Sequence, residues 1–214
     1  MEIARRIAEW LSAWPHRAAE PGLSDTELHR AEETFELTFP PLLREVLTLI
    51  HPIRRPVAPQ PGIHQSPSTI PDWRLRDVER TRLLIDIPAD GVLFDVEDED
   101  NDFWWHAWGP RPETLPERMA VAERELARVP RLIPLMGHLY VAASDDSPVF
   151  SVIQTRVYLY AVSLADLGDD EARTAAIRSA TWPVGTVPFW SELCAYASHR
   201  DTADPLGRLG SGGF

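Results

Sequence analysis

The side chains best equipped to bind or react lie in one short stretch, residues 97–108. Its first half supplies five carboxylates and one amide, and its second half supplies three tryptophans, a phenylalanine and a histidine. The acids are Glu97, Asp98, Glu99, Asp100 and Asp102. Because like charges so close together repel each other, we expect this acidic segment, residues 97–102, to extend into water as a hairpin loop. The sequence therefore predicts an exposed acidic surface.

A calcium ion is the first ligand that such a segment suggests. Asp98, Asp100 and Asp102 occupy the first, third and fifth positions of an EF-hand-like loop. That loop requires glycine at its sixth position and a bidentate glutamate at its twelfth, where this chain has Phe103 and Gly109. We therefore predict no metal site here, and favour a basic protein partner for the acidic surface.

The aromatic residues that follow predict which side chains complete this surface. Val92, Phe94 and Val96 alternate with Leu93, Asp95 and Glu97, a two-residue period typical of a half-buried strand, with residues 103–108 as its partner. On such a strand Phe103 and Trp105 share the face that we expect to join the core, while Trp104 and His106 point the other way. We predict that Trp104 and His106 contact the partner together with the five acids.

An enzyme is an alternative, through His106 and His138. His106 lies beside the acidic segment and His138 follows a turn at Gly137, so the two rings could meet across a sheet and transfer protons. Neither a nucleophile elbow nor a glycine-rich phosphate loop accompanies them. We therefore predict no catalytic residue.

Other reactive groups are isolated. The single cysteine, Cys194, rules out an internal disulfide or a multi-cysteine metal site and is typical of a small buried hydrophobe. No two of the seven histidines have the four-residue spacing that places two rings on one helix face. The chain has no lysine, which excludes P-loop and Schiff-base chemistry. We predict no cofactor.

Composition limits the class of protein and of partner. With 214 residues, 44% of them hydrophobic and 25% charged, the chain suits one domain, which we place at 1–197 with a flexible tail at 198–214. The net charge of −12 would repel nucleic acid over most of the surface. No stretch approaches the roughly 18 apolar residues that span a bilayer. Arg5, Arg6 and Glu9 interrupt the first apolar pattern, so we expect a cytosolic protein. The oligomeric state is left open.

Hydrophobic periodicity predicts an α+β fold. Ser24 and Glu27 form a capping box that should open a helix, and Pro41 is typical of a first helical turn. Apolar residues at helical spacing predict helices at 3–14, 24–35, 42–50, 74–87, 115–126, 163–180 and 188–197, and β-branched and aromatic runs predict three or four strands, at 131–135, 138–144, 148–153 and 156–162. Residues 52–71, with six prolines, should form an irregular loop. We expect an antiparallel or mixed sheet of about five to six strands, covered by helices on one side.

Three blocks of the chain resemble the SUKH superfamily, which includes the fungal Smi/Knr cell-wall-assembly regulators and many bacterial relatives. Residues 23–47 are similar to its opening pattern of a capped helix, a proline and a second helix. Residues 94–112, FDVEDEDNDFWWHAWGPRP, resemble its more specific block, and residues 132–167 resemble its third block. Two features depart from the pattern: Leu139 stands where arginine is usual, and the acidic segment is longer and more acidic.

The resemblance implies a non-enzymatic binding fold, and in the bacterial branch an immunity protein that neutralises a toxin, often a nuclease. Nuclease toxins tend to be basic because they bind phosphate, so an acidic surface could occlude their positive cleft. Our leading hypothesis is such an immunity protein. The alternative is a regulatory or scaffold adaptor of the Smi/Knr type in cell-wall or stress signalling.

Overall fold

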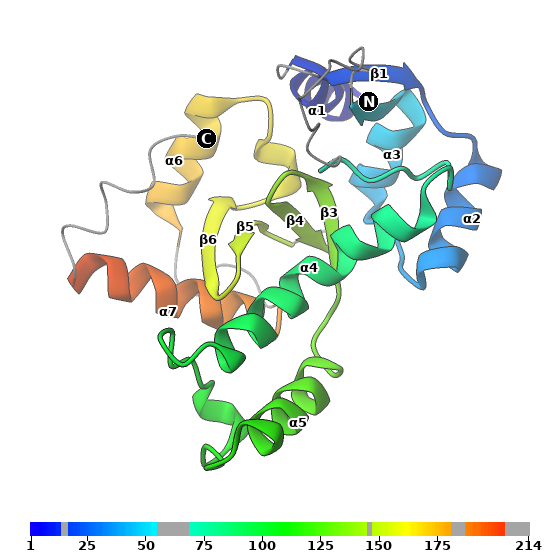
Figure 1. Cartoon of the computed structure of the whole chain (residues 1–214). Helices are drawn as coiled ribbons and strands as arrows, with labels where there is room; N and C mark the ends of the chain where they lie inside the picture. The colour runs from blue at the N-terminus through cyan, green and yellow to red at the C-terminus, as the bar shows by residue number, and fades with distance from the viewer. Residues whose placement is uncertain (14–16, 55–68, 145–146, 181–186, 204–214) are drawn as a thin grey trace, which may run out of the picture.

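The computed structural model describes residues 1–13, 17–54, 69–144, 147–180 and 187–203 (Figure 1). These residues form an α+β fold with two antiparallel sheets, which confirms the predicted class. The helices of this part of the chain are α1 (Glu2–Ala13), α2 (Asp25–Phe35), α3 (Pro41–Leu49), α4 (Val78–Glu97), α5 (Leu115–Leu126), α6 (Asp170–Ser179) and α7 (Trp190–Ala203), with 3-10 turns η1 (His106–Trp108) and η2 (Leu164–Asp166). The strands are β1 (Arg17–Pro21), β2 (Ile50–Arg54), β3 (Leu132–Met136), β4 (Leu139–Ala142), β5 (Val149–Ile153) and β6 (Arg156–Ala161).

The N-terminal part combines α1, α2 and α3 with the two-stranded sheet. The predicted capping box is present, because the Ser24 hydroxyl accepts from the Glu27 amide at 3.3 Å while the Glu27 carboxylate accepts from the Ser24 amide at 2.8 Å. Strand β1 pairs with β2 from Arg17 opposite Arg54 to Pro21 opposite Ile50. The sequence analysis missed this sheet, since β2 enters the proline-rich region where we predicted a loop. Residues 55–68 of that loop lie outside the described residues.

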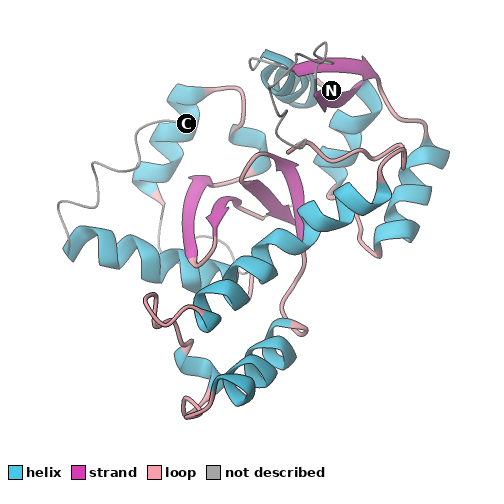
Figure 2. Cartoon of the chain, viewed as in Figure 1, coloured by secondary structure: helices cyan, strands magenta, loops and turns pink. Residues whose placement is uncertain are grey.

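The second sheet is a meander in the order β3-β4-β5-β6, and it confirms the strands predicted within 131–162. Successive side chains of these strands join opposite clusters of the core. Ile133 and Val141 face α1, α2 and α3, whereas Leu132 and Tyr140 face α4, α5 and α7. The sheet is therefore covered by helices on both faces, not on one as predicted (Figure 2).

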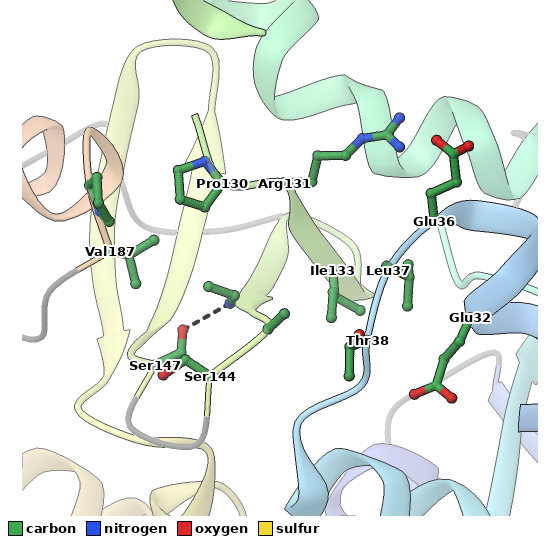
Figure 3. Close-up of a pocket in the computed structure, with 13 residues that line it drawn as sticks. Glu32, Glu36, Leu37, Thr38, Pro130, Arg131, Ile133, Ser144, Ser147 and Val187 are labelled. Carbon is green, nitrogen blue, oxygen red and sulfur yellow. Dashed lines mark hydrogen bonds between the residues drawn. The ribbon is translucent and has the colours of Figure 1, made fainter. Parts of the chain in front are cut away.

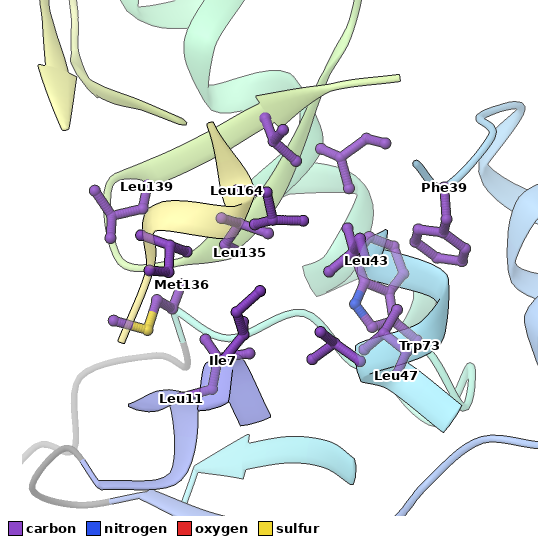
Figure 4. Close-up of a cluster of buried hydrophobic side chains, with 14 of the residues drawn as sticks. Ile7, Leu11, Phe39, Leu43, Leu47, Trp73, Leu135, Met136, Leu139 and Leu164 are labelled. Atoms are coloured by element: carbon purple, nitrogen blue, oxygen red, sulfur yellow. The ribbon is translucent and has the colours of Figure 1, made fainter. Parts of the chain in front are cut away.

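Figure 4 shows the first of these clusters, in which α1 and α3 meet the β3–β4 hairpin. Ile7 and Leu11 contribute from α1, Leu43 and Leu47 from α3, and Trp73 from the segment before α4. The ring of Trp73 packs edge-on against Phe39 and Phe35, with centroids 4.9 and 5.8 Å away. This cluster fixes the N-terminal helices to the sheet.

The prediction that a helix ends near Pro88 and that a strand follows at 92–97 was wrong, because α4 runs unbroken through both segments. Proline lacks the amide that would bond the carbonyl four residues earlier. Here the Tyr140 hydroxyl donates to that carbonyl, of Leu84, at 3.1 Å. Gly91 lies where α4 meets the β5–β6 turn, and a Cβ there would come within 2.9 Å of the Gln154 Cα atom. Both helix-breaking residues are accommodated by contacts with the sheet.

The partner strand predicted at 103–108 is also wrong. These residues form an irregular segment followed by η1, which leads to α5. At the C-terminal end, α7 runs to Ala203, past the predicted boundary at 197. Residues 204–214 of the predicted tail lie outside the described residues. None of the described helices combines the length and the apolar character that crossing a membrane requires.

Candidate functional site

The acidic segment begins directly at the C-terminal end of α4, and a buried carboxylate holds it there. Asp95 is 3% exposed. One of its oxygens accepts from the Thr155 amide at 2.9 Å and from the Thr155 hydroxyl at 2.5 Å, and the other accepts from the Asn101 side chain at 2.8 Å. Asp95 thus joins α4, the β5–β6 turn and the acidic segment. Asp95 was not predicted to have this role, although a carboxylate within the apolar run 92–96 indicates a buried acid that needs hydrogen-bond partners.

The five predicted acids divide into two groups. Asp98 accepts from the Asp100 amide and from the Asn101 side chain, both at 3.0 Å, so it shapes the turn. Asp102 forms an ion pair with Arg111, which lowers the pKa of that carboxyl. The remaining three are exposed, and their side chains have no partner among the described residues: Glu97, Glu99 and Asp100. These three form the free part of the acidic surface.

The aromatic residues within 103–108 pack mainly against the protein, next to the acidic segment. Phe103 and Trp105 are 8% and 5% exposed, as predicted for the core-facing pair. Trp104 is half-buried, and its indole N–H donates to the Gly109 carbonyl at 2.9 Å while its ring packs edge-on against Trp108 at 5.3 Å. Trp108 stacks in turn on Phe189, just before α7, at 6.1 Å. Part of Trp104 therefore stays accessible beside the acids, but most of the cluster is structural.

The exposed face of α4 adds an apolar stripe that leads to the acidic segment. Leu83, Ile87 and Phe94 are 54%, 40% and 52% exposed. Their spacings of four and seven residues place them in one line along the helix. Asp90 lies in the same line beside Asp86, and burial together with that neighbouring carboxylate raises the pKa of Asp90. We call the six residues Leu83, Ile87, Phe94, Glu97, Glu99 and Asp100 the α4 surface.

A second charged cluster lies in the N-terminal part, and it was not predicted. His51 is fully buried, and burial lowers its pKa, so the ring is neutral. Its Nε2 atom accepts from the Trp73 amide at 3.2 Å, and its Nδ1 atom lies 3.3 Å from the Glu20 carboxylate. Arg74 donates to Glu20 at 2.8 Å and to Glu27 at 2.9 Å.

The other members of this cluster, which we call the Arg74 network, are also paired. Arg74 donates further to the Pro21 and Gly22 carbonyls at 2.7 and 3.0 Å. Arg76 forms ion pairs with Glu20 and Asp72, both at 2.9 Å. Its residues come from β1, α2, β2 and the segment before α4, which sequence spacing alone does not bring together. Because every charge has a partner, the network holds these elements together.

The two histidines of the enzyme alternative lie at different ends of the molecule. His106 is exposed in η1, next to α5, with its ring 4.5 Å from that of Trp105. His138 is exposed in the turn between β3 and β4, where the Gly137 amide donates to the Thr69 carbonyl. The structure therefore does not bring them together. Cys194 is 1% exposed, and burial raises its thiol pKa to about 12.

No group of three or more His, Cys, Asp or Glu side chains is arranged to hold a metal ion within the described ranges. Comparisons with protein-family models, with curated proteins and with solved structures found no match for this chain. The similarity to the SUKH superfamily therefore stays a prediction from the sequence blocks. The function has to be argued from the surface itself.

Proposed function

We propose that this protein is a non-enzymatic protein-binding module that uses the α4 surface. The observation that carries the proposal is the continuity of an exposed apolar stripe with three free carboxylates. Leu83, Ile87 and Phe94 are large side chains that remain at least 40% exposed in the folded chain. Protein interfaces combine a buried apolar centre with a polar rim, which is the arrangement found on this helix.

The size of the surface is suitable for such a contact. A helix of 20 residues such as α4 is about 30 Å long. A standard protein interface buries roughly 800 Å² on each partner, which one long exposed helix and the adjoining segment can supply. The net charge of −12 and the free acids at one end favour a partner with a basic surface.

We infer further that the partner is a toxin and that the protein is its cytosolic immunity protein. This step depends on the resemblance to the bacterial branch of the SUKH superfamily and on charge. A nuclease toxin must carry a positive cleft for phosphate, and Glu97, Glu99 and Asp100 would occupy that cleft as a substitute polyanion. Neutralisation then requires only occlusion, without any chemical step.

The experiment starts with affinity purification of the tagged protein from native extract at low and high salt, followed by mass spectrometry. A salt-sensitive basic partner with a toxin or nuclease domain supports the immunity function. Recovery of housekeeping envelope or signalling proteins instead would favour the adaptor alternative. The partner is then purified for kinetic measurements.

Two matched triple variants locate the contact. Charge reversal on the α4 surface, E97R/E99R/D100R, should slow association at least tenfold at low salt, because steering by charge accelerates encounter by about 10- to 1,000-fold. The control E9R/E33R/E123R makes the same change in net charge at exposed acids of α1, α2 and α5. Equal slowing by both variants would contradict a localised site.

The apolar stripe is tested separately. The variant L83S/I87S/F94S keeps every acid, so it should leave association nearly unchanged and accelerate dissociation, which is where most interface mutations act. Unchanged dissociation would show that the partner does not contact the helix face.

A further inference from the structure

A cavity of about 660 Å³ lies where the N-terminal part meets the four-stranded sheet (Figure 3). One wall is the last turn of α2 with the link to α3, and the opposite walls are formed by Ala143, Ser144 and Ser147 after β4 and by Val187 and Pro188 before α7. Small-molecule sites in proteins typically occupy roughly 300 to 1,000 Å³ and often lie between two packed units. The size and position of this cavity are those of a ligand site.

Polar side chains hold the walls in place. On one side, the Glu32 carboxylate accepts from the Phe39 amide at 3.0 Å and from Arg44 at 2.7 Å. On the other side, the Ser147 hydroxyl accepts from the Ala142 amide at 2.8 Å and donates to the Pro148 carbonyl at 2.9 Å. These groups are fully used, so both walls are formed before any ligand arrives.

The lining surface has an apolar floor and a charged rim. Ile133 of β3 is buried, and Val187 and Leu37 face the same space from two sides. At the rim, Arg131 is neutralised by Asp86 at 2.9 Å and also donates to the Phe35 carbonyl at 3.3 Å. A ligand here would therefore meet apolar surface and an arginine that already has its counter-ion.

Three polar groups of the lining remain available. The Glu36 carboxylate and the Thr38 and Ser144 hydroxyls make no hydrogen bond with the part of the chain that the structure describes. Glu36 caps α2 in the left-handed region at φ 53°, which places its side chain at the rim beside Arg131. Arg131 and Glu32 are each paired with an opposite charge, whereas Glu36 forms no ion pair with the described residues.

We propose that this cavity binds a small amphipathic cation, an amine or guanidine on an apolar body. The body lies against Ile133 and Val187, and the cationic group faces Glu36, with the two hydroxyls accepting further hydrogen bonds. An anion of the same shape would meet the Glu36 carboxylate and be disfavoured. This second site is independent of the proposed protein-binding function.

Three probes of one shape and different charge test the proposal: tryptamine, 3-ethylindole and indole-3-propionate. Amide chemical shifts of the full ¹⁵N-labelled chain are followed during titration. Tryptamine should bind with a millimolar dissociation constant, as expected for so few atoms, and should shift Thr38, Ile133 and Ser144. Indole-3-propionate should bind at least about threefold more weakly, because exposed ion pairs contribute little to binding.

Two variants and a control sharpen the result. Glu36→Gln should remove most of the difference between tryptamine and 3-ethylindole, whereas Glu33→Gln, an exposed acid on the same helix, should leave it intact. Ala143→Phe places a ring in the cavity from an exposed position and should abolish binding of all three probes while the shift dispersion of the fold is kept. Shifts at other residues, an equal affinity for the anion, or unchanged binding in both variants would overturn the proposal.

A fourth probe distinguishes a free ligand from a side chain of a protein. N-acetyl-arginine amide presents a guanidinium on a backbone, as a partner protein would. Binding weaker than that of tryptamine supports a small-molecule site. Binding that is tighter by tenfold or more would overturn it in favour of an arginine pocket for a partner.

Discussion

The Arg74 network and the acidic segment are both rich in carboxylates, yet they differ in how many of those carboxylates have partners. In the network, Glu20 and Glu27 are each bonded to arginine, and both lie against the body of the protein. In the acidic segment, Glu97, Glu99 and Asp100 project from the end of a helix without partners among the described residues. Paired charges hold elements together, whereas free charges are available to another molecule. The comparison separates the acids that stabilise this protein from those that we propose bind.

Replacing Arg74 should have the largest effect. Arg74→Met removes hydrogen bonds to two carboxylates and two backbone carbonyls, so we expect a loss of about 3 kcal/mol in the free energy of unfolding, measured in urea. The control Arg30→Met changes an exposed arginine of α2 with no partner within the described residues and should cost less than about 0.5 kcal/mol. A loss below about 1 kcal/mol for Arg74→Met would show that the network does not hold the N-terminal elements.

Asp95 is a paired carboxylate directly beside the free acids of the acidic segment, so it tests the difference between paired and free acids within one region. Asp95→Ala leaves the Thr155 amide and hydroxyl and the Asn101 side chain without their acceptor, so we expect a loss of about 2 kcal/mol. Asp100→Ala, five residues later on the exposed side, should change the free energy of unfolding by less than about 0.5 kcal/mol. Similar losses for the two variants would contradict the division between paired and free acids.

Acid should reduce the stabilisation that the Arg74 network provides. Hydrogen bonds from Arg76, together with His51 and Arg74, lower the pKa of Glu20 to about 2. The Ser24 amide and Arg74 lower the pKa of Glu27 to about 2. Both carboxyls have a higher pKa in the unfolded chain, near 4.5. Their stabilisation is therefore complete above pH 4.5 and is lost as the pH falls towards 2.

Urea unfolding at several pH values between 6 and 2 measures this loss. The variant Glu20→Gln should show a shallower decrease in the free energy of unfolding over that range than the natural sequence. Glu99→Gln, which removes a carboxylate without a partner in the described chain, is the matched control. If Glu20→Gln followed the same curve as the natural sequence, the Glu20 contacts would not contribute to stability.

The smallest expected effect is that of the charge-reversed α4 surface on folding. The variant E97R/E99R/D100R removes no bond from these side chains and relieves repulsion in the segment, so the free energy of unfolding should stay within about 0.5 kcal/mol of the natural value. Thermal and urea unfolding measure it. A large destabilisation would mean that these acids serve the fold and would remove the basis for the binding test.

Local signals in the sequence predicted much of the fold. The Ser24 capping box, Pro41 and the apolar spacing of α5 each depend on residues close in the chain, and the structure has a helix at each of these places. The strands between 132 and 161 could also be predicted from the sequence, because β-branched runs alternate there with turn residues. The buried pair of Phe103 and Trp105 followed from their spacing, although the strand assumed for them was wrong.

The features that were missed depend on contacts between distant residues. The carbonyl that Pro88 leaves without its helical partner is bonded by Tyr140, and Gly91 lies beside Gln154, both more than 50 positions away. The Arg74 network joins four segments, and only its Glu27 belongs to a local sequence pattern that was predicted, the capping box with Ser24. For the acidic segment, composition predicted that it would be exposed, but only the structure separates its three free acids from Asp98 and Asp102.

The hydrogen bond from the Tyr140 hydroxyl affects how the two halves of α4 are aligned. The bond from Tyr140 to the Leu84 carbonyl supports α4 at the turn where Pro88 removes its own support, and Leu83 and Ile87 lie just before this point while Phe94 and the acids lie after it. If α4 were broken at Pro88, the part of the apolar stripe before the break and the acids after it would no longer lie along one face of a continuous helix. The buried Tyr140 hydroxyl thus supports α4 between the two halves of the α4 surface, so the proposed partner, if it binds both halves, would depend on a residue that it does not contact.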